Sequence, residues 1–387
     1  MNEPSLDLAI LLFDLTPSGV ANNAIRVAKA AHAAGIRTEI WLSQRQGALL
    51  GNVPPEIPVR SFGQDIGLGY SRDERKKAVT QATDGLAALL REARPKVLLS
   101  AGNHAHSAAV GAIAASAVQT RLIGRISNAL PRFHWDPARL RGSIRKRLAT
   151  RKRFGAMDRI ICVSKELRHQ LVSELLLNRG KMAVIPNGVD MEAVRRLAAE
   201  PIEHRWFKDS AVPIIVGVGR LVPQKNFEVL LRAFAGARRV RPMRLILLGS
   251  GPEEARLKRL ARRLGVTRHV DLPGHVPNPF PYLSKASLFV LPSRWEGMSN
   301  ALLEALASGC PAIATHCPGS TELLDHGTWG HLVAVDDVAA LRDAMLATLA
   351  NPPSREHQMD RAAQYELGAA MQRYVEIIRE EMTKAGR

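Results

Sequence analysis

The sequence has few cysteines and no hydrophobic run long enough to cross a membrane. Its 387 residues include three cysteines, Cys162, Cys310 and Cys317. Their odd number and spacing do not fit a metal site, so reduced, buried thiols are expected. No apolar stretch approaches the ~20 residues of a membrane-spanning helix. The N-terminus lacks a basic segment, and Asp7 and Asp14 bracket its short apolar run, so no signal peptide is expected. These absences predict a soluble, cytoplasmic protein.

Acidic residues are scarce relative to basic ones, and aromatic residues are few. The chain has 54 Lys and Arg against 36 Asp and Glu, a formal net charge of +18. Such an excess indicates an anionic partner (nucleic acid, a membrane surface or an acidic substrate) unless it reflects a generally arginine-rich proteome. Aromatic residues make up 5% of the chain and no nucleic-acid-binding motif is recognised, so nucleic acid is not an expected partner. Because an Asp-x-Asp motif is also missing, no metal is expected, nor any other cofactor.

The succession of apolar and helical segments predicts an α/β fold. A chain of this length exceeds one ordinary core, so two domains of about 190 residues are expected. The first half opens with a buried strand at 6–13, a turn containing glycine and a helix at 20–34. The second half restarts in the same way with a strand at 213–218. Both halves therefore read as Rossmann-like units with parallel strands.

The domain boundaries follow from these restarts. Residues 51–75 are rich in Gly and Pro and are expected to form a surface loop, and residues 195–212 are expected to be a linker. We expect an N-terminal domain at 1–190, a C-terminal domain at 191–360 and a C-terminal helical segment at 361–387.

The stretch Leu291–Glu304 carries the clearest chemical signal in the chain. A buried strand, Leu288–Leu291, leads through Pro292 to the start of a helix, with Glu296 in the turn and Glu304 inside the helix. Unpaired backbone N–H groups and the positive end of the helix dipole meet at such a start, which is a usual place for phosphate. Carboxylates beside an anion site suit sugar hydroxyls. A nucleotide sugar combines both chemistries.

Residues 291–322, LPSRWEGMSNALLEALASGCPAIATHCPGSTE, resemble the donor-binding signature of retaining glycosyltransferases of the GT-B fold, family 4. Pro318-Gly319 stands where the family has a Gly-Gly pair. Further matching segments are IPNGVD (185–190), GVGRLVPQKN (217–226) and LLGSGPE (247–253), in order and at family spacing. The resemblance implies two Rossmann-like domains facing a central cleft and a C-terminal helix that crosses back to the first domain.

The resemblance also implies roles for individual residues. Arg220 and Lys225 would hold the donor diphosphate, Glu296 the hydroxyls of the transferred sugar, and Glu304 the ribose. Glu296, Arg220 and Lys225 would be the catalytic residues and would act by charge stabilisation, in a front-face reaction with retention, without an enzyme nucleophile or a metal. The remaining expected donor contacts are Gly251 in a tight turn, main-chain groups of His275 and Val276 beside the base, and Gly297, Met298, Ser299, Asn300 and Ala301.

Sites in the first half are expected where its strands end, because ligands bind beyond the carboxyl ends of parallel strands. Gly19 lies in the first such turn, which in relatives approaches the donor phosphate or the acceptor. Asn103 and His104 follow a later strand and are candidates for a sugar contact, although His104 and His106 are equally suited to capping the next helix. Ser127 follows another strand, at a position where many relatives have His.

A basic helix without acidic residues is predicted at 139–153. It contains eight Lys and Arg, and Leu140, Ile144 and Leu148 form a narrow apolar stripe at helical spacing. This combination is typical of a helix that lies on a membrane surface and binds anionic headgroups. The alternative is a solvated helix that packs its stripe on the domain.

The sequence therefore predicts a retaining glycosyltransferase that takes its sugar from a nucleotide diphosphate sugar, with a UDP-sugar as the expected donor. The expected acceptor is a glycan or a lipid-linked glycan in polysaccharide, lipopolysaccharide or glycolipid assembly, reached at the cytoplasmic face of the membrane. Two alternatives stay open. One is a soluble transferase resembling glucan synthases, and the other is a catalytically silent sugar-binding partner of another transferase.

Overall fold

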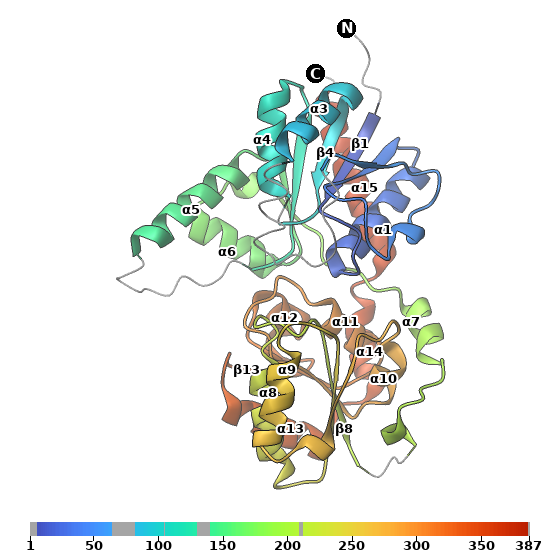
Figure 1. Cartoon of the computed structure of the whole chain (residues 1–387), viewed down its shortest axis with the longest axis vertical. Helices are drawn as coiled ribbons and strands as arrows, with labels where there is room; N and C mark the ends of the chain where they lie inside the picture. Colours follow the sequence, from blue (N-terminus) through green and yellow to red (C-terminus); the bar gives the residue numbers. More distant parts are fainter. Residues whose placement is uncertain (1–5, 64–81, 104, 130–139, 209–211, 386–387) are drawn as a thin grey trace. The chain divides into compact units, whose positions relative to one another are not determined.

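The computed structural model describes residues 6–63, 82–103, 105–129, 140–208 and 212–385, with the backbone alone for 140–143. The chain divides into two compact units (Figure 1). Unit 1 contains Met1–Pro186 and Gly368–Arg387, and unit 2 contains Asn187–Leu367. The chain thus leaves unit 1 after Pro186, where residue 190 was predicted, and returns after Leu367, where residue 360 was predicted.

Unit 1 is built on a parallel sheet of seven strands in the order β3-β2-β1-β4-β5-β6-β7. Every residue of β1 is buried, because helices cover both faces of such a sheet and its strands are continuous apolar runs. The strands are β1 (Leu6–Leu12), β2 (Thr38–Leu42), β3 (Val59–Ser61), β4 (Pro95–Ser100), β5 (Arg121–Ile126), β6 (Arg159–Cys162) and β7 (Met182–Val184). The helices are α1 (Gly19–Ala33), α3 (Thr83–Ala93), α4 (His106–Ser116), α5 (Leu140–Gly155), α6 (Lys165–Leu175) and α15 (Leu367–Ala385).

Unit 2 has a parallel sheet of six strands in the order β10-β9-β8-β11-β12-β13. Its core lies between the sheet and the helices, with Phe227, Leu230 and Phe234 of α8 among the buried residues. The strands are β8 (Ile214–Val218), β9 (Arg244–Leu248), β10 (Val270–Gly274), β11 (Leu288–Leu291), β12 (Ala312–Thr315) and β13 (His331–Val333). The helices are α7 (Met191–Ala198), α8 (Phe227–Arg238), α9 (Glu254–Arg263), α10 (Phe280–Lys285), α11 (Asn300–Ala307), α12 (Pro318–Leu323), α13 (Val338–Ala350) and α14 (Arg355–Ala363). Short 3-10 turns occur at Leu50–Asn52, Arg179–Lys181, Arg205–Phe207, Thr267–His269 and Asp325–Gly327.

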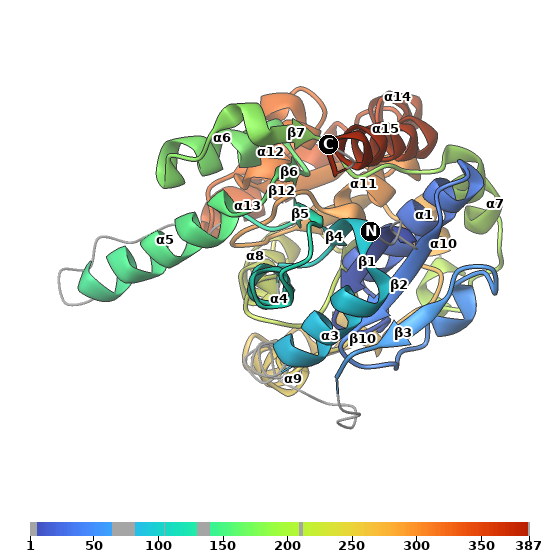
Figure 2. The ribbon, with the colours of Figure 1, turned by 90° about the horizontal axis from the view of Figure 1, so that it is seen from above.

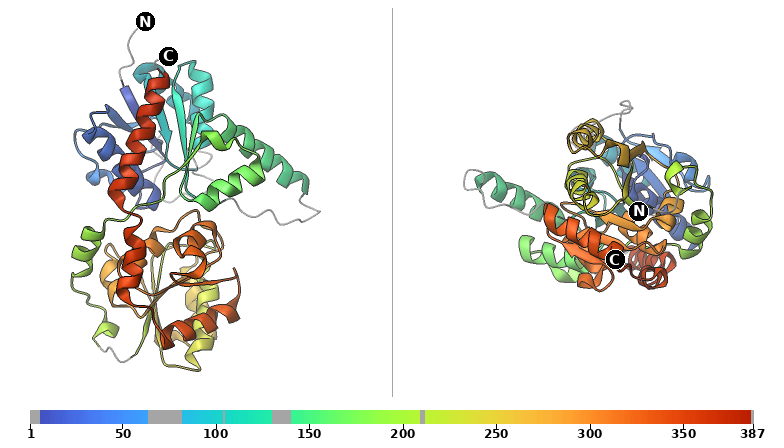
Figure 3. Two further views of the ribbon diagram at one scale, coloured as in Figure 1. Left: turned by 180° about the vertical axis from the view of Figure 1, so that it is seen from behind. Right: turned by 90° about the horizontal axis from the view of Figure 1, so that it is seen from below.

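The C-terminal helix α15 belongs to unit 1, as predicted. Figure 3 shows it lying over one face of the first sheet. Two arginines of β5 fasten it: Arg121 Nη2 lies 2.7 Å from Glu381 Oε2, and Arg125 Nε donates to the Tyr374 hydroxyl at 2.9 Å. Glu381, Arg125 and Tyr374 are all buried. A helix at the end of the chain therefore completes the core of the first unit.

Three elements were not anticipated from the sequence. β3 lies inside the segment 51–75 that was expected to be a loop, where it pairs with the edge of β2. The first residues of the expected linker at 195–212 belong to helix α7, which runs to Ala198. Asp190 caps the start of that helix by accepting the Ala193 N–H at 2.9 Å. α10 was missed as well. All three elements are short, and short segments carry too few positions to show a period.

Asp7 joins three segments of unit 1 at the start of β1. Its carboxylate accepts the backbone N–H of Arg37 at 3.2 Å and Arg37 Nε at 3.0 Å, and it lies 3.0 Å from Lys96 Nζ. Burial by itself would raise the pKa of Asp7, but the hydrogen bonds from Arg37 and Lys96 outweigh it and lower the pKa from 3.8 to about 2. The folded state therefore favours the charged carboxylate.

We expect Asp7→Asn to destabilise unit 1 by about 2 kcal/mol at neutral pH, since one pKa unit corresponds to about 1.4 kcal/mol. The folded-state pKa is the lower one, so this contribution is complete above the unfolded value of 3.8 and is lost as the pH falls towards 2. Urea unfolding followed by circular dichroism should show the gap between parent and variant shrinking over that window. Glu92→Gln, which removes an exposed partner of Arg60, is the control. A gap that stays constant down to pH ~2 would contradict the assignment.

Candidate functional site at the carboxyl edge of the second sheet

The residues with the clearest predicted roles gather where β8 and β11 end. The two strands are neighbours, and the strand order reverses between them, since β9 and β10 continue on one side and β12 and β13 on the other. Such a reversal leaves a crevice beyond the carboxyl ends of the strands. The loop after β8 carries Arg220 and Lys225, and the loop after β11 carries Glu296. The fold thus brings residues 71 positions apart to one place.

Lys225 and Glu296 form a largely buried ion pair. Lys225 Nζ lies 2.7 Å from Glu296 Oε1, and the two side chains are 15% and 7% exposed. The Ser293 hydroxyl donates to the same carboxylate oxygen at 2.9 Å. Within the part of the chain that the structure describes, no bond to the second oxygen, Oε2, is found. The pair therefore holds the carboxylate in place and leaves one of its oxygens as an acceptor for a ligand.

Glycines shape the loop that carries Lys225. Gly219 has φ +155°, and a side chain there would lie 3.1 Å from Lys225 Cε, so the glycine makes room for the lysine stem. Gly249 and Gly251 pack against the same loop, where an added Cβ would lie 2.0 Å from Gly219 O and 2.4 Å from Leu221 O. The expected donor contact of Gly251 stays a prediction, because this packing alone already requires a glycine there.

A hydrogen-bond network ties the two loops together. Arg294 donates its backbone N–H to Gln224 O at 2.8 Å, and Gln224 Nε2 donates to Trp295 O at 2.8 Å. Asp336 accepts from Asn226 Nδ2 at 2.9 Å and from Arg294 Nε at 3.1 Å. Sequence reasoning missed these residues, since they are distant along the chain and no local pattern links them. They fix Lys225 and Glu296 relative to each other.

The start of α11 lies beside this pair. Ser299 caps the helix by accepting the Leu302 N–H at 3.4 Å, and Asn300 Oδ1 accepts from Asn187 Nδ2 at 2.7 Å. Asn187 also donates to Met298 O at 3.3 Å. The side chains of Ser299 and Asn300 therefore hold the turn. Since Ser299 already accepts the Leu302 N–H, the first-turn amides that remain for a ligand among the described residues are those of Asn300 and Ala301, for which the helix provides no acceptor.

The beginning of α12 lies directly against this turn. A Cβ added to Gly319 would lie 2.0 Å from Gly297 O and 2.4 Å from Met298 Cα. The pair Pro318-Gly319 thus keeps the glycine that the packing needs, and proline occupies the first helical position, which it tolerates well. The predicted residues Gly297 and Met298 are buried beneath α12.

The other predicted donor residues lie at the same edge of the sheet. Arg220 is exposed, Glu304 is half-buried in α11, and His275 and Val276 follow β10. The backbone of that last loop is joined to the glycine turn after β9, where Gly249 N–H donates to Gly274 O at 2.8 Å. The structure therefore places Arg220, His275 and Val276 on loops at the carboxyl ends of β8 and β10, and Glu304 on the helix that follows β11.

Two of the residues predicted in unit 1 also meet. Asn103 Oδ1 accepts the backbone N–H of Ser127 at 3.4 Å, where β4 and β5 end side by side. Gly19 is the first residue of α1, after the neighbouring strand β1. His104 lies outside the described residues. His106 does not cap α4 with its side chain, because it is fully buried and its Nδ1 lies 2.7 Å from Ser100 Oγ.

Metal-binding clusters and membrane-spanning helices are absent from the described residues, and two of the three cysteine thiols are held in their protonated form. Within the described ranges, no group of three or more His, Cys, Asp or Glu could hold a metal ion. Burial raises the pKa of Cys162 and of Cys310 to about 12, so both thiols stay protonated at neutral pH. Of the helices that the structure describes, none is long and apolar enough to cross a bilayer.

Comparisons with known proteins show the family of this chain. Residues 17–193 match the sequence model of glycosyltransferase family 4, and residues 212–351 match that of glycosyl transferases group 1. A glycosyltransferase of Methanocaldococcus jannaschii is 34% identical over 172 residues, 43% of this chain and 42% of that protein. The N-acetylgalactosamine-N,N'-diacetylbacillosaminyl-diphospho-undecaprenol 4-alpha-N-acetylgalactosaminyltransferase of Campylobacter jejuni is 32% identical over 206 residues, 53% of this chain and 54% of that protein. The chain spans about half the length of the curated relatives it matches.

Solved structures confirm the fold class. Sucrose-phosphate synthase from Thermosynechococcus elongatus superposes with a TM-score of 0.80 at 18% identity, covering 98% of this chain and 100% of that one. Anabaena HepE in complex with UDP gives a TM-score of 0.74 at 18% identity, covering 97% and 100%. The two parallel-sheet α/β domains of this chain are therefore those of the GT-B fold, as predicted.

We expect Gly319→Ala to lower the free energy of unfolding by about 1–3 kcal/mol or more, because the added methyl group would overlap backbone atoms that cannot move aside. Thermal unfolding followed by circular dichroism measures the effect. Gly236→Ala is the matched control in the same unit, since its Cβ would meet only the flexible Arg342 side chain, at 3.1 Å from Cδ. Equal midpoints for the parent and Gly319→Ala would show that α12 does not rest on the 297–298 turn.

Proposed function

The chain belongs to the family 4 (group 1) glycosyltransferases of the GT-B fold, and we propose that it moves a sugar from a nucleotide diphosphate sugar to an acceptor hydroxyl with retention. One observation carries this proposal: the buried pair of Lys225 and Glu296 beside the start of α11, at the point where the strand order reverses. That point offers cations and amides to a diphosphate and a carboxylate to sugar hydroxyls.

The diphosphate would be held by Arg220, Lys225 and the first amides of α11. An ammonium has three N–H donors, so Lys225 can keep Glu296 and still donate to a phosphate oxygen. Arg220 adds a planar fork of donors that suits phosphate. Because Glu296 balances the charge of Lys225, the positive charge of Arg220 and the helix dipole are needed to bind the anion. These groups stabilise the leaving diphosphate.

The sugar and the ribose would be bound by the two acids. Glu296 would accept hydroxyl protons of the sugar through Oε2, while Oε1 stays with Lys225 and Ser293. Glu304, about one turn into α11, would accept from the ribose. In the reaction the bond between the anomeric carbon and the diphosphate oxygen breaks, and its electrons stay with the diphosphate. The acceptor oxygen bonds to the same face of the sugar, and its proton passes to the departing diphosphate. No enzyme nucleophile takes part.

We infer a lipid-linked glycan as the acceptor class. The name of the Campylobacter jejuni relative specifies a diphospho-undecaprenol acceptor, and the predicted basic helix at 139–153 would bring this chain to the anionic surface in which such an acceptor resides. The fold does not decide between this acceptor and a soluble one, since sucrose-phosphate synthase shares it. A catalytically silent sugar binder is disfavoured, because a silent site has no need of a largely buried Lys–Glu pair that leaves one carboxylate oxygen open to a ligand.

A screen of nucleotide sugars would identify the donor. Binding to the folded state raises the unfolding midpoint by linkage. UDP and UDP-sugars are the first probes, followed by GDP- and ADP-sugars, and the donor that gives the largest shift then enters the kinetic assays.

Glu304→Ala should raise the KM for the donor by about 10-fold or more with a smaller change in kcat, because a ribose contact is equal in the ground and transition states. Glu296→Gln and Lys225→Ala should lower kcat by about 10²–10³, since both act where charge develops. Glu254→Ala on the exposed face of α9 is the control. Unchanged nucleotide affinity in Glu304→Ala would refute the ribose contact, and full turnover in both other variants would place the site elsewhere.

Metal independence is a separate prediction. With cations on protein side chains to neutralise the diphosphate, EDTA should leave turnover within about twofold, which is under 0.5 kcal/mol of barrier. If EDTA abolished activity and Mg²⁺ or Mn²⁺ restored it, a metal ion would neutralise the diphosphate together with Arg220 and Lys225.

A further inference from the structure

Helix α5 concentrates positive charge on unit 1. It has 16 residues and no acid, and it extends away from the first sheet in Figures 1 and 2. Residues 144–149 are all exposed. The cations whose side chains are described are Arg145, Lys146, Arg147, Arg151, Lys152 and Arg153.

The two residues of the apolar stripe whose side chains are described, Ile144 and Leu148, are not packed on the domain. Ile144 is 49% exposed and Leu148 57%, so for these two residues the alternative in which the stripe covers the core is wrong. Phe154 anchors the helix at its C-terminal end instead. It is 4% exposed, and its ring meets the edge of His106 with centroids 5.9 Å apart. Water therefore reaches two large aliphatic side chains that an ordinary amphipathic helix would bury.

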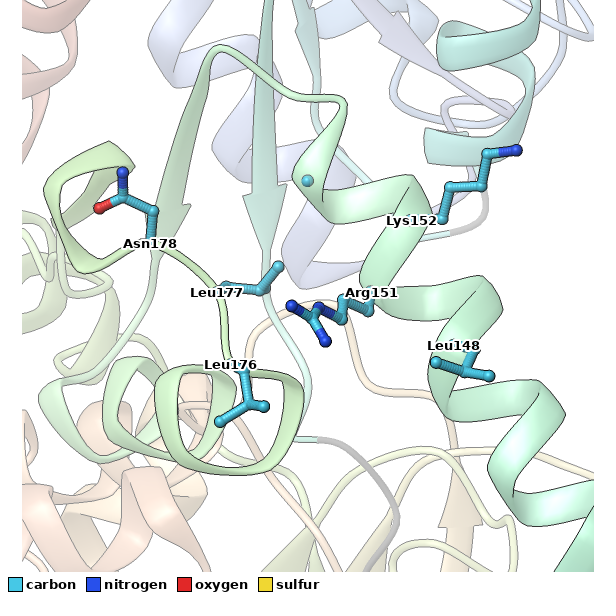
Figure 4. Close-up of a pocket in the computed structure, with 7 residues that line it drawn as sticks. Leu148, Arg151, Lys152, Leu176, Leu177 and Asn178 are labelled. Atoms are coloured by element: carbon cyan, nitrogen blue, oxygen red, sulfur yellow. The ribbon is translucent and has the colours of Figure 1, made fainter.

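The end of α6 adds to this surface. Leu176 follows α6 with a left-handed backbone (φ 51°) and is 65% exposed. With α5 it lines a groove of about 480 Å³, shown in Figure 4, in which Arg151 points from α5 towards the α6 end. Ile144, Leu148 and Leu176 are three of the four large hydrophobic residues that are exposed in the described part of the chain. The residues of the groove are Leu148, Arg151, Lys152, Gly155, Leu176, Leu177 and Asn178.

Helix α9 of unit 2 shows that basic composition alone does not produce this surface. It carries five Lys and Arg in ten residues, yet its apolar residues Leu257 and Leu260 are 2% and 4% exposed. Two of its cations are also paired, Lys258 with Glu254 at 2.6 Å and Arg256 with Glu253 at 2.7 Å. α5 differs in having neither acids nor a covered apolar face.

We propose that α5 and the Leu176 turn form a docking face for an anionic phospholipid bilayer. At 3.6 residues per turn, Arg147 and Arg151 lie on one side of the exposed stripe and Arg145 and Lys152 on the other. Cations on both flanks bind headgroup phosphates while the aliphatic side chains enter the boundary of the acyl chains. Leu176 extends the apolar contact beyond one helix. Charge complementarity favours an anionic bilayer as the partner, because α5 carries cations and no acidic residue that a basic partner could bind.

Sedimentation of the full-length chain with vesicles tests the face. Vesicles of phosphatidylcholine with 30% phosphatidylglycerol, on the order of the anionic content of membranes that attract basic segments, should bind the parent, and pure phosphatidylcholine should bind it far less. Changing Arg145, Lys146 and Arg147 to Glu should lower the partition coefficient about 100-fold or more, since each cation contributes a factor of about five. Leu148→Ser with Leu176→Ser should lower it about 10-fold. Higher salt should weaken binding of the parent.

Matched controls lie in unit 2. Val240→Ser changes the fourth exposed hydrophobic residue, which is 72% exposed, and Arg259, Arg262 and Arg263 changed to Glu alter α9 by the same charge. Both should bind anionic vesicles within about threefold of the parent, less than one cation contributes. Failure of the parent to bind, or equal losses in the α9 variant, would overturn the proposal. The proposal would also be overturned if the parent formed a dimer in the absence of lipid and the Leu148 and Leu176 changes dissociated that dimer. Because sedimentation requires no turnover, these outcomes are independent of the proposed transfer reaction.

Discussion

The ion pair between Lys225 and Glu296 is the constraint on which the site depends. A buried charge without a partner is costly, so each residue requires the other, and removing one destabilises the place where both loops meet. The glycine at 219 admits the lysine stem, and Ser293 holds the carboxylate oxygen that the lysine binds. The reversal of strand order between β8 and β11 puts this pair at a crevice instead of in the core.

Residues outside the predicted motif supply the rigidity of that site. Asp336, Asn226 and Arg294 join the loops after β8 and β11, and Asn187 holds the turn before α11. A network of this kind keeps charges in position before a ligand arrives, which is what electrostatic stabilisation of a leaving group requires. The first unit shows a different use of charge, because the described cations of α5 other than Arg153 are exposed and face solvent together with aliphatic side chains.

The sequence predicted the parallel sheets and most long elements, because buried strands such as Leu288–Leu291 are uninterrupted apolar runs. It also predicted Lys225 and Glu296, through a motif with fixed spacing. It did not predict that they pair, since that contact depends on strand order. Nor could periodicity show whether the stripe of Ile144 and Leu148 is covered. Whether these side chains are covered depends on the direction in which α5 leaves the domain, and no local sequence pattern specifies that direction.

Hydrogen–deuterium exchange with and without UDP would show whether a nucleotide diphosphate binds at the Lys225–Glu296 pair and the start of α11. A ligand that accepts hydrogen bonds from the first amides of α11 protects them from exchange, and closing the crevice slows local opening. With UDP, peptides covering 219–226 and 296–303 should exchange more slowly, and peptides of α9 should not change. Protection confined to peptides outside these two loops would contradict binding at this pair.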